Sequence, residues 1–243
     1  MIRRLVIVAF AGALLSVAWA TEPARDGVRA AERDGGQARA DPAQQRPVRP
    51  GHRPHHAGRK HRRIRWRASV AVGRPDAGRL IRGVMLPAQG LHFFTWDPVL
   101  RRAPDRWWRR FGTARLIRTL LSVIDAYAAA HPGAPRVGVG DLSRPGGGDF
   151  GPAYGGIGHA SHQNGLDADV CYPRLDRRER SPATAAQIDR RLAQDLVDRF
   201  VAAGAQLVFV GPATALHGPP GVVQVLAHHD NHLHVRLPPG SAT

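Results

Sequence analysis

The chain has 243 residues and a formal net charge of +16, a length that suits one domain with appended segments. A charge of this size favours an anionic partner such as nucleic acid. Lys60, however, is the only lysine, so no lysine-rich helix is present, and the composition argues against a nucleic-acid ligand. Cys171 is the single cysteine, which excludes an internal disulfide.

The first 20 residues have the features of a secretory signal peptide. Arg3 and Arg4 precede an apolar run over residues 5–18, which ends in the small-x-small pattern Ala18-Trp19-Ala20. The alternative is an uncleaved anchor helix, but the run has about 14 residues and a membrane span needs about 20. No cysteine follows the run, which argues against a lipoprotein. We therefore expect a mature chain secreted to the periplasm or the cell wall, without a stable membrane span and away from nucleic acid.

Residues 21–63 are predicted to form a disordered basic tether. Residues 21–67 contain 13 Arg and Lys against 5 Asp and Glu, and large apolar residues are almost absent before Ile64. Such a segment cannot bury enough apolar surface to offset its ordering entropy. Its charge would suit attachment to anionic wall or envelope polymers. The alternative is a solvated linker with no ligand.

The folded domain is predicted over residues 64–243. Apolar residues recur at helical spacing from Thr113 to a stop at His131. A second helix is predicted from Thr184, with Gln187 as its capping-box partner, to Gly204. Short Val- and Leu-rich runs bounded by Gly or Pro predict four strands, at Arg136–Leu142, Leu166–Tyr172, Gln206–Val210 and His232–Leu237. The pattern indicates an α+β fold, with a small, mostly antiparallel sheet and packed helices in a single catalytic domain.

A long Gly-rich loop over residues 144–158 separates the first two predicted strands. Its length is typical of functional or mobile loops. Its glycines do not follow a strand-to-helix phosphate motif, so we exclude nucleotide binding. Cys171 lies in the apolar run after this loop and is predicted to be a small buried side chain rather than a nucleophile.

Two histidines of the last predicted strand share one face. Side chains alternate along a strand, so His232 and His234 point one way and Leu233 points the other. Two buried imidazoles need polar partners, and a metal ion with a reacting water would supply them. The alternative is a half-exposed edge strand whose histidines meet solvent.

A second polar group lies where the predicted strand 166–172 begins. Asp167 and Asp169 share a face of this strand, and His162 precedes them at the end of the Gly-rich loop. One of these carboxylates, His162 and His234 would give three ligands and leave a fourth position open, as a catalytic zinc requires. Spacing alone leaves Asp167 and Asp169 equivalent.

These two segments carry a family resemblance. The string from Gly158 to Asp169 and the run from His229 to Arg236 resemble the penicillin-insensitive murein endopeptidases, within the wider group of lysostaphin-like and D-Ala-D-Ala zinc peptidases. That group shares a histidine, an aspartate seven residues later and a distant His-x-His, which are matched here by His162, Asp169, His232 and His234. Gly140-Asp141-Leu142-Ser143 and Gly146-Gly147 also resemble the family, and the likeness extends over residues 72–237.

The resemblance implies a role for each polar residue. It implies a zinc ion (Zn²⁺) held by three protein ligands, His162, Asp169 and His234. His232 would be the general acid/base, and Asp167 would orient a histidine or the loop. Histidines matching His159 and His229 would hydrogen-bond the attacking water or the tetrahedral oxyanion.

The resemblance also implies a reaction, the hydrolysis of peptide cross-links in peptidoglycan between D-alanine and a diamino acid. Two alternatives stay open. One is a D-alanyl carboxypeptidase or dipeptidase of the same superfamily, which an arginine clamp for a free carboxylate would favour; Arg144 is a candidate for that clamp. The other is a non-catalytic, metal-bearing domain that binds the cell wall, against which the presence of His232 argues.

Overall fold

A computed structural model describes residues 63–151 and 160–240. The predicted signal peptide and the predicted tether up to residue 62 lie outside the described residues, as does the later part of the Gly-rich loop, residues 152–159. Within the described ranges, no helix combines the length and the apolar character needed to cross a membrane.

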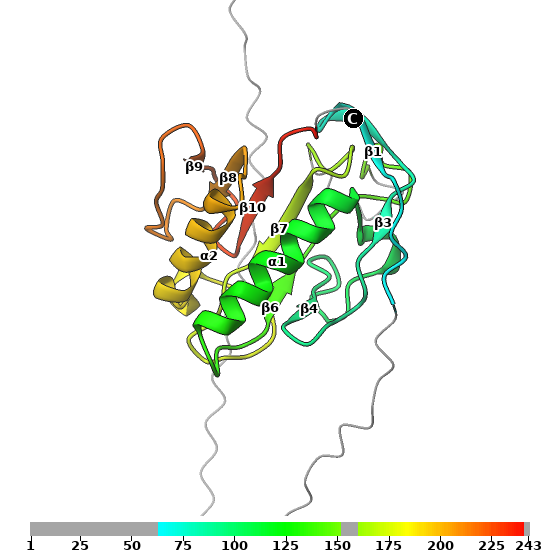
Figure 1. The fold of residues 1–243 in the computed structure, drawn as a ribbon. Helices are drawn as coiled ribbons and strands as arrows, with labels where there is room; N and C mark the ends of the chain where they lie inside the picture. Colours follow the sequence, from blue (N-terminus) through cyan, green and yellow to red (C-terminus); the bar gives the residue numbers. More distant parts are fainter. Residues whose placement is uncertain (1–62, 152–159, 241–243) are drawn as a thin grey trace, which may run out of the picture. The chain divides into compact units, whose positions relative to one another are not determined.

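A six-stranded sheet forms the centre of the domain (Figure 1). Its order is β4-β6-β7-β10-β8-β9. The strands are β4 (Phe93–Thr95), β6 (Val137–Val139), β7 (Asp167–Cys171), β10 (His232–Arg236), β8 (Leu207–Val210) and β9 (Val223–Val225). The three inner pairs, β6–β7, β7–β10 and β10–β8, are antiparallel, and the two outer pairs are parallel. The predicted α+β fold with a mostly antiparallel sheet is therefore confirmed.

Two short ribbons precede the long helix in sequence. The first pairs β1 (Val70–Arg74) with β2 (Ala77–Ile81), and the second pairs β3 (Val84–Met85) with β5 (Phe111–Gly112). A 3₁₀ helix, η1 (Trp107–Arg109), leads directly into β5. Neither ribbon was predicted from the sequence. β3 and β5 have only two residues each, and Gly and Arg interrupt the apolar pattern of β1 and β2.

Helix α1 (Ala114–Ala130) confirms the first predicted helix. The Thr113 side chain caps its N-terminus by accepting a hydrogen bond from the Leu116 amide, and His131 ends it. Its buried residues recur at helical spacing: Leu116, Ile117, Leu120, Val123, Ile124 and Tyr127. Figure 1 shows α1 lying over β6 and β7 of the sheet. The buried residues of α1 belong to the core cluster.

Helix α2 (Arg190–Ala202) begins six residues after the predicted start at Thr184, so that boundary is wrong. Thr184 instead precedes a separate 3₁₀ turn, η3 (Ala185–Gln187), and makes no side-chain cap. The Gln187 side chain, predicted as a capping-box partner, accepts hydrogen bonds from the Arg174 guanidinium and the Ala183 amide. The true cap is Asp189, which accepts from the Leu192 amide.

The two faces of β7 and β10 have different environments. Ala168, Val170, Leu233 and Val235 belong to the same buried cluster as the apolar residues of α1 and α2. The intervening side chains therefore point to the other face, and these are the aspartates of β7 and the histidines of β10. The strand period predicted from the sequence is thus confirmed, and it gathers polar groups on the face away from the core.

Candidate metal centre and active site

The pairing of β7 with β10 sets the positions of the polar side chains. In this antiparallel pair His234 lies opposite Asp169, and Arg236 lies opposite Asp167. Directly opposed residues have Cβ atoms only about 5 Å apart, so each carboxylate meets a basic side chain of the neighbouring strand. The strand pairing therefore brings side chains from two segments that are distant in the sequence into one compact cluster.

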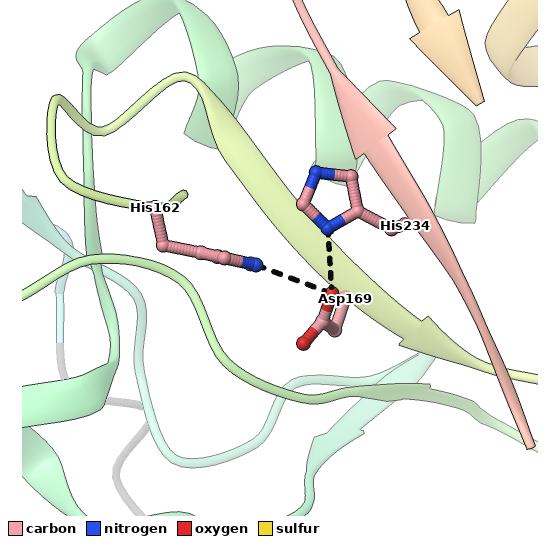
Figure 2. A group of neighbouring side chains, drawn as sticks. All are labelled: His162, Asp169 and His234. Atoms are coloured by element: carbon pink, nitrogen blue, oxygen red, sulfur yellow. Dashed lines mark ion pairs between the residues drawn. The ribbon is translucent and has the colours of Figure 1, made fainter. Parts of the chain in front are cut away.

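His162, Asp169 and His234 converge at the middle of this strand pair (Figure 2). His162 Nε2 lies 3.4 Å from Asp169 Oδ1, and His234 Nδ1 lies 3.2 Å from the same oxygen. All three residues are buried, and their candidate ligand atoms lie within 4.8 Å of one another. The structure thus brings together the three residues predicted as metal ligands.

His162 reaches this cluster from a constrained backbone position. Its φ is +70°, a left-handed conformation that residues with a Cβ adopt only at a cost. The His162 amide donates to Asp167 Oδ2 at 3.3 Å, and its ring packs edge-on against Phe150. Strained backbone of this kind is concentrated at functional sites, which fits a ligand at the end of a long loop.

Asp167 fixes the orientation of His234. Its Oδ1 lies 2.9 Å from His234 Nε2 and accepts a hydrogen bond from Arg236 Nε at 2.7 Å. Because Nε2 is engaged with Asp167, Nδ1 is the His234 nitrogen that faces Asp169. The two aspartates, equivalent by spacing, therefore have different contacts: Asp169 lies between the two histidines, and Asp167 lies behind one of them.

The buried charges of the cluster depend strongly on one another. Burial would raise the pKa of Asp167, but the hydrogen bond to His234 and nearby positive charge lower it to about 2. Burial likewise opposes ionisation of Asp169, yet the adjacent His162 and His232 hold its pKa well below the usual value. Burial would lower the pKa of His234, whereas the two carboxylates raise it to about 9. Asp169 is therefore ionised at neutral pH, as a carboxylate ligand to a cation must be, and so is Asp167 behind His234.

Two further histidines border the cluster. His232 Nε2 lies 3.7 Å from Asp169 Oδ1, and its Nδ1 lies 2.6 Å from Asn231 Oδ1. The His229 ring lies 4.8 Å from the His232 ring, its Nδ1 is 2.8 Å from the Ala227 carbonyl oxygen, and burial lowers its pKa. His159, the third histidine predicted beside the metal, lies outside the described residues.

The cluster opens into a cavity of about 610 Å³. Asp169 and His234 line it together with His229 and His232, so one side of the three-residue cluster is accessible to a ligand. Arg144, the candidate carboxylate clamp, is not among the residues that line this cavity. Its guanidinium donates to the Asp149 carbonyl instead.

Cys171 also lines the cavity, but its thiol is buried and burial raises its pKa to about 12. A thiol that stays protonated is a poor nucleophile. The prediction of a buried, unreactive side chain fits this environment.

A buried ion pair holds the segment that is hydrogen-bonded to β7 on the side away from β10. Arg109 of η1 forms a two-pronged pair with the Asp141 carboxylate, and both side chains are almost completely buried. The Asp141 carbonyl accepts the Asp169 amide hydrogen bond at 2.9 Å, and the Gly140 amide donates to the Asp169 carbonyl at 2.8 Å. Sequence analysis did not find Arg109, because it lies in a run of Trp and Arg residues with no periodic pattern.

A third charged residue, Asp105, is buried beside this pair. Its carboxylate lies 3.9 Å from Arg109 Nε. Burial and the neighbouring Asp141 charge raise the pKa of Asp105 to about 8, although Arg109 opposes that shift. The folded protein therefore binds a proton here that the unfolded chain releases above its ordinary pKa, 3.8.

This shift predicts a pH effect on stability. As the pH rises from about 4 to about 8, the free energy of unfolding should fall relative to that of an Asp105→Asn variant. The largest slope for one proton is about 1.4 kcal/mol per pH unit. Urea denaturation of both proteins between pH 5 and 8.5 measures the difference, and parallel curves over that range would show that Asp105 is ionised in the folded state.

The three residues at the cluster fit a zinc ion. Atoms bound at about 2.0–2.1 Å to a tetrahedral metal lie about 3.3–3.4 Å from one another, close to the 3.4 and 3.2 Å that separate Asp169 Oδ1 from the two imidazole nitrogens. Two imidazoles and one carboxylate are a donor set that zinc accepts. Asp167 behind His234 supplies the carboxylate–histidine contact that commonly orients a ligating imidazole.

Comparison with known proteins places the chain in a class of peptidases. The family model described as penicillin-insensitive murein endopeptidase matches residues 71–207, more than half of the chain. The chain belongs to the penicillin-insensitive murein endopeptidase family, as its sequence motifs predicted. The match contains His162 and Asp169 and ends before His234, which β10 brings to the cluster.

Two curated relatives have the same description. Penicillin-insensitive murein endopeptidases of Escherichia coli O157:H7 and of its strain EC4115 / EHEC are each 32% identical to this chain over 132 residues. The aligned part covers 54% of this chain and 42% of each relative. The chain thus matches less than half the length of these relatives.

Proposed function

We propose that the protein is a zinc-dependent murein endopeptidase that hydrolyses peptide cross-links of peptidoglycan between D-alanine and a diamino acid. The observation that carries the proposal is the convergence of His162, Asp169 and His234 beside a cavity that Asp169, His232 and His234 line. Family membership and the names of the two relatives support the reaction class.

The three ligand residues would hold the zinc ion through His162 Nε2, Asp169 Oδ1 and His234 Nδ1. When bound, zinc supplies Lewis-acid chemistry: it polarises a carbonyl and makes a nearby water more acidic. Asp167 keeps His234 turned so that Nδ1 faces the other two ligands. The protein's contribution is therefore a fixed set of donors at the wall of the cavity.

The contacts of His232 support a role in proton transfer during hydrolysis. Its Nε2 borders Asp169 and its Nδ1 contacts Asn231, so one nitrogen is held by the protein and the other faces the cluster. It would accept a proton from the attacking water and deliver one to the leaving amine as the carbon–nitrogen bond breaks. His229, beside it, would stabilise the oxyanion of the tetrahedral intermediate, and we assign the same role to His159.

The direct test is digestion of purified cell wall by the mature protein, with the released fragments identified by mass spectrometry. Cross-linked dimers should disappear and the matching monomers should accumulate, and a zinc chelator should stop the reaction. Loss of terminal D-alanine from uncross-linked pentapeptides, with the dimers intact, would indicate a carboxypeptidase instead. No change in either would indicate a binding domain without catalysis.

The contact between Asp167 and His234 gives a prediction about metal affinity. Asp167→Asn should weaken zinc binding about 10- to 100-fold, because the amide is a poorer partner for the ligating imidazole than the carboxylate. Competition with a chromogenic chelator measures the change, and Asp125→Asn, on the exposed side of α1, is the control. Unchanged affinity in Asp167→Asn would remove the orienting role from this residue.

The proposed substrate implies a location outside the cytoplasm. We propose that the signal peptide is removed after Ala20, that the protein acts in the periplasm or at the cell wall, and that the tether, residues 21–63, binds anionic wall or envelope polymers. N-terminal sequencing of the exported protein tests the cleavage. Wall binding of a chain lacking residues 21–63, measured at increasing salt, tests the tether.

A further inference from the structure

Arginines are concentrated at the cavity that contains the metal cluster. Four of them line it: Arg101, Arg109, Arg174 and Arg180. Two are neutralised by partners, since Arg109 pairs with Asp141 and Arg174 pairs with Asp176. Within residues 63–151 and 160–240, the guanidinium groups of the other two, Arg101 and Arg180, have no ion-pair or hydrogen-bond partner. The cavity therefore presents two positive groups that are available to a ligand.

The carboxylates that line the cavity do not neutralise Arg101 and Arg180. The carboxylates that line the cavity are Asp141 and Asp169. Asp141 is held by Arg109, and Asp169 belongs to the metal cluster. An anionic group on the ligand would meet the two arginines without displacing an existing ion pair.

Arg101 is held at the cavity by a tightly bonded turn. The buried Asp97 carboxylate accepts hydrogen bonds from the Val99 and Leu100 amides at 3.0 and 2.9 Å, and Arg106 Nε donates to its other oxygen at 2.5 Å. The backbones of Asp97 and Arg102 are also bonded to each other. At Arg101 the chain adopts a φ of +50°, a conformation that a non-glycine residue keeps only when its surroundings impose it.

Arg180 is held between two anchored neighbours. Glu179 makes a two-pronged ion pair with Arg136, at 2.7 and 2.6 Å. Ser181 Oγ donates to the Asn231 carbonyl at 3.0 Å, directly before His232 in the chain. These contacts fasten the loop to both the sheet and the segment of the proposed general acid/base, so the base of the Arg180 side chain has a fixed place at the cavity.

We propose that Arg101 and Arg180 form a subsite for a carboxylate of the substrate peptide. This inference rests on the proposed function and specifies its substrate: a peptide with a free carboxylate close to the bond that is cut. A diamino acid that is cross-linked through the amino group of a carbon bearing a carboxyl has such a carboxylate next to the scissile amide. Guanidinium groups match a carboxylate with two parallel hydrogen bonds. The arginines would thus select, by its charge, a carboxylate on the carbon next to the scissile nitrogen. A cross-linked diamino acid and a terminal D-alanine both have such a carboxylate, and digestion of cell wall separates these two substrates.

The test compares two soluble cross-linked muropeptide dimers, identical except that the diaminopimelate carboxyl beside the cross-link is free in one and amidated in the other. Equilibrium binding to the full-length chain with His232→Ala is measured by calorimetry, so that hydrolysis does not interfere. The free carboxylate should bind about 10- to 50-fold more tightly than the amide. Arg101→Ala or Arg180→Ala alone should reduce this preference roughly 3- to 10-fold, because both side chains are exposed and solvent weakens each contact, and the double variant should abolish it.

Two neighbouring arginines serve as matched controls. Arg102→Ala and Arg178→Ala remove the same charge from the same two segments, and neither residue lines this cavity. Both should keep the full preference for the carboxylate. If the preference for the carboxylate came from a general electrostatic attraction to the basic surface, the two controls should lose as much of it as Arg101→Ala and Arg180→Ala.

Hydrolysis of the same two dimers by the unmodified protein separates this inference from the proposed function. Equal binding of the two dimers, or a preference that survives in the double variant, overturns the subsite even if both dimers are cut. A preference that depends on Arg101 and Arg180 but is accompanied by no hydrolysis supports the subsite and overturns the peptidase assignment.

Discussion

His234→Ala should lose bound zinc and peptidase activity together, whereas His232→Ala should keep its zinc and lose at least about 100-fold in turnover. The two residues lie on the same face of β10, but His234 Nδ1 is 3.2 Å from Asp169 Oδ1 and is one of three candidate ligands. Removing one of three protein ligands should empty the site. Removing His232 leaves all three ligands and deletes only proton transfer, which commonly contributes about 10²- to 10⁴-fold.

The measurement is zinc content by elemental analysis beside the hydrolysis rate of cross-linked muropeptides. His217→Ala is the control, because His217 is exposed, contacts Gln194 and does not line the cavity. Zinc retained in His234→Ala and lost in His232→Ala would reverse the two roles. Unchanged rates in both variants would place hydrolysis at another site.

Arg109→Met should lower the free energy of unfolding by about 3–5 kcal/mol, the usual cost of leaving one member of a buried ion pair without its partner. Arg109 and Asp141 are 1% and 0% exposed, so water cannot solvate the carboxylate that remains. The nearby Asp105 keeps its proton at neutral pH and supplies no positive charge to replace Arg109. Replacing both partners, in Arg109→Met with Asp141→Leu, should recover most of the loss, because no uncompensated charge is then buried.

Urea denaturation at one pH measures all three proteins. Arg102→Met is the control, since exposed substitutions of this kind usually change stability by less than about 0.5 kcal/mol. If Arg109→Met is within about 1 kcal/mol of the parent, or if the double variant is less stable than Arg109→Met, the ion pair does not stabilise the segment that is hydrogen-bonded to Asp169.

The positions of the candidate ligands on β7 and β10 could be predicted because they follow the strand period. Alternation alone placed Asp167 with Asp169 and His232 with His234, and the structure confirms both pairs of faces. Alternation could not decide which aspartate of β7 lies opposite which histidine of β10, because that depends on the register between the two strands. The family resemblance selected Asp169 and His234, and the contacts of Asp167 with His234 Nε2 and Arg236 fit that selection.

Other features could not be predicted, for identifiable reasons. The start of α2 was wrong because Thr184 and Asp189 are both acceptable caps, and the residues between them form a 3₁₀ turn that tertiary contacts stabilise. Arg101 and Arg180 look like ordinary surface arginines in the sequence. They differ from Arg109 and Arg174, which line the same cavity, because those two have ion-pair partners. Which arginines pair depends on the fold and could not be predicted from the sequence.

We propose that His162, Asp169 and His234 together hold one zinc ion. Anomalous diffraction at the zinc edge from crystals of the protein grown with zinc tests it most directly. We expect one strong peak about 2.0–2.2 Å from His162 Nε2, Asp169 Oδ1 and His234 Nδ1, with Asp167 still on Nε2 of His234. A peak bound to His232 in place of one of these residues, or no peak among them, would contradict the account.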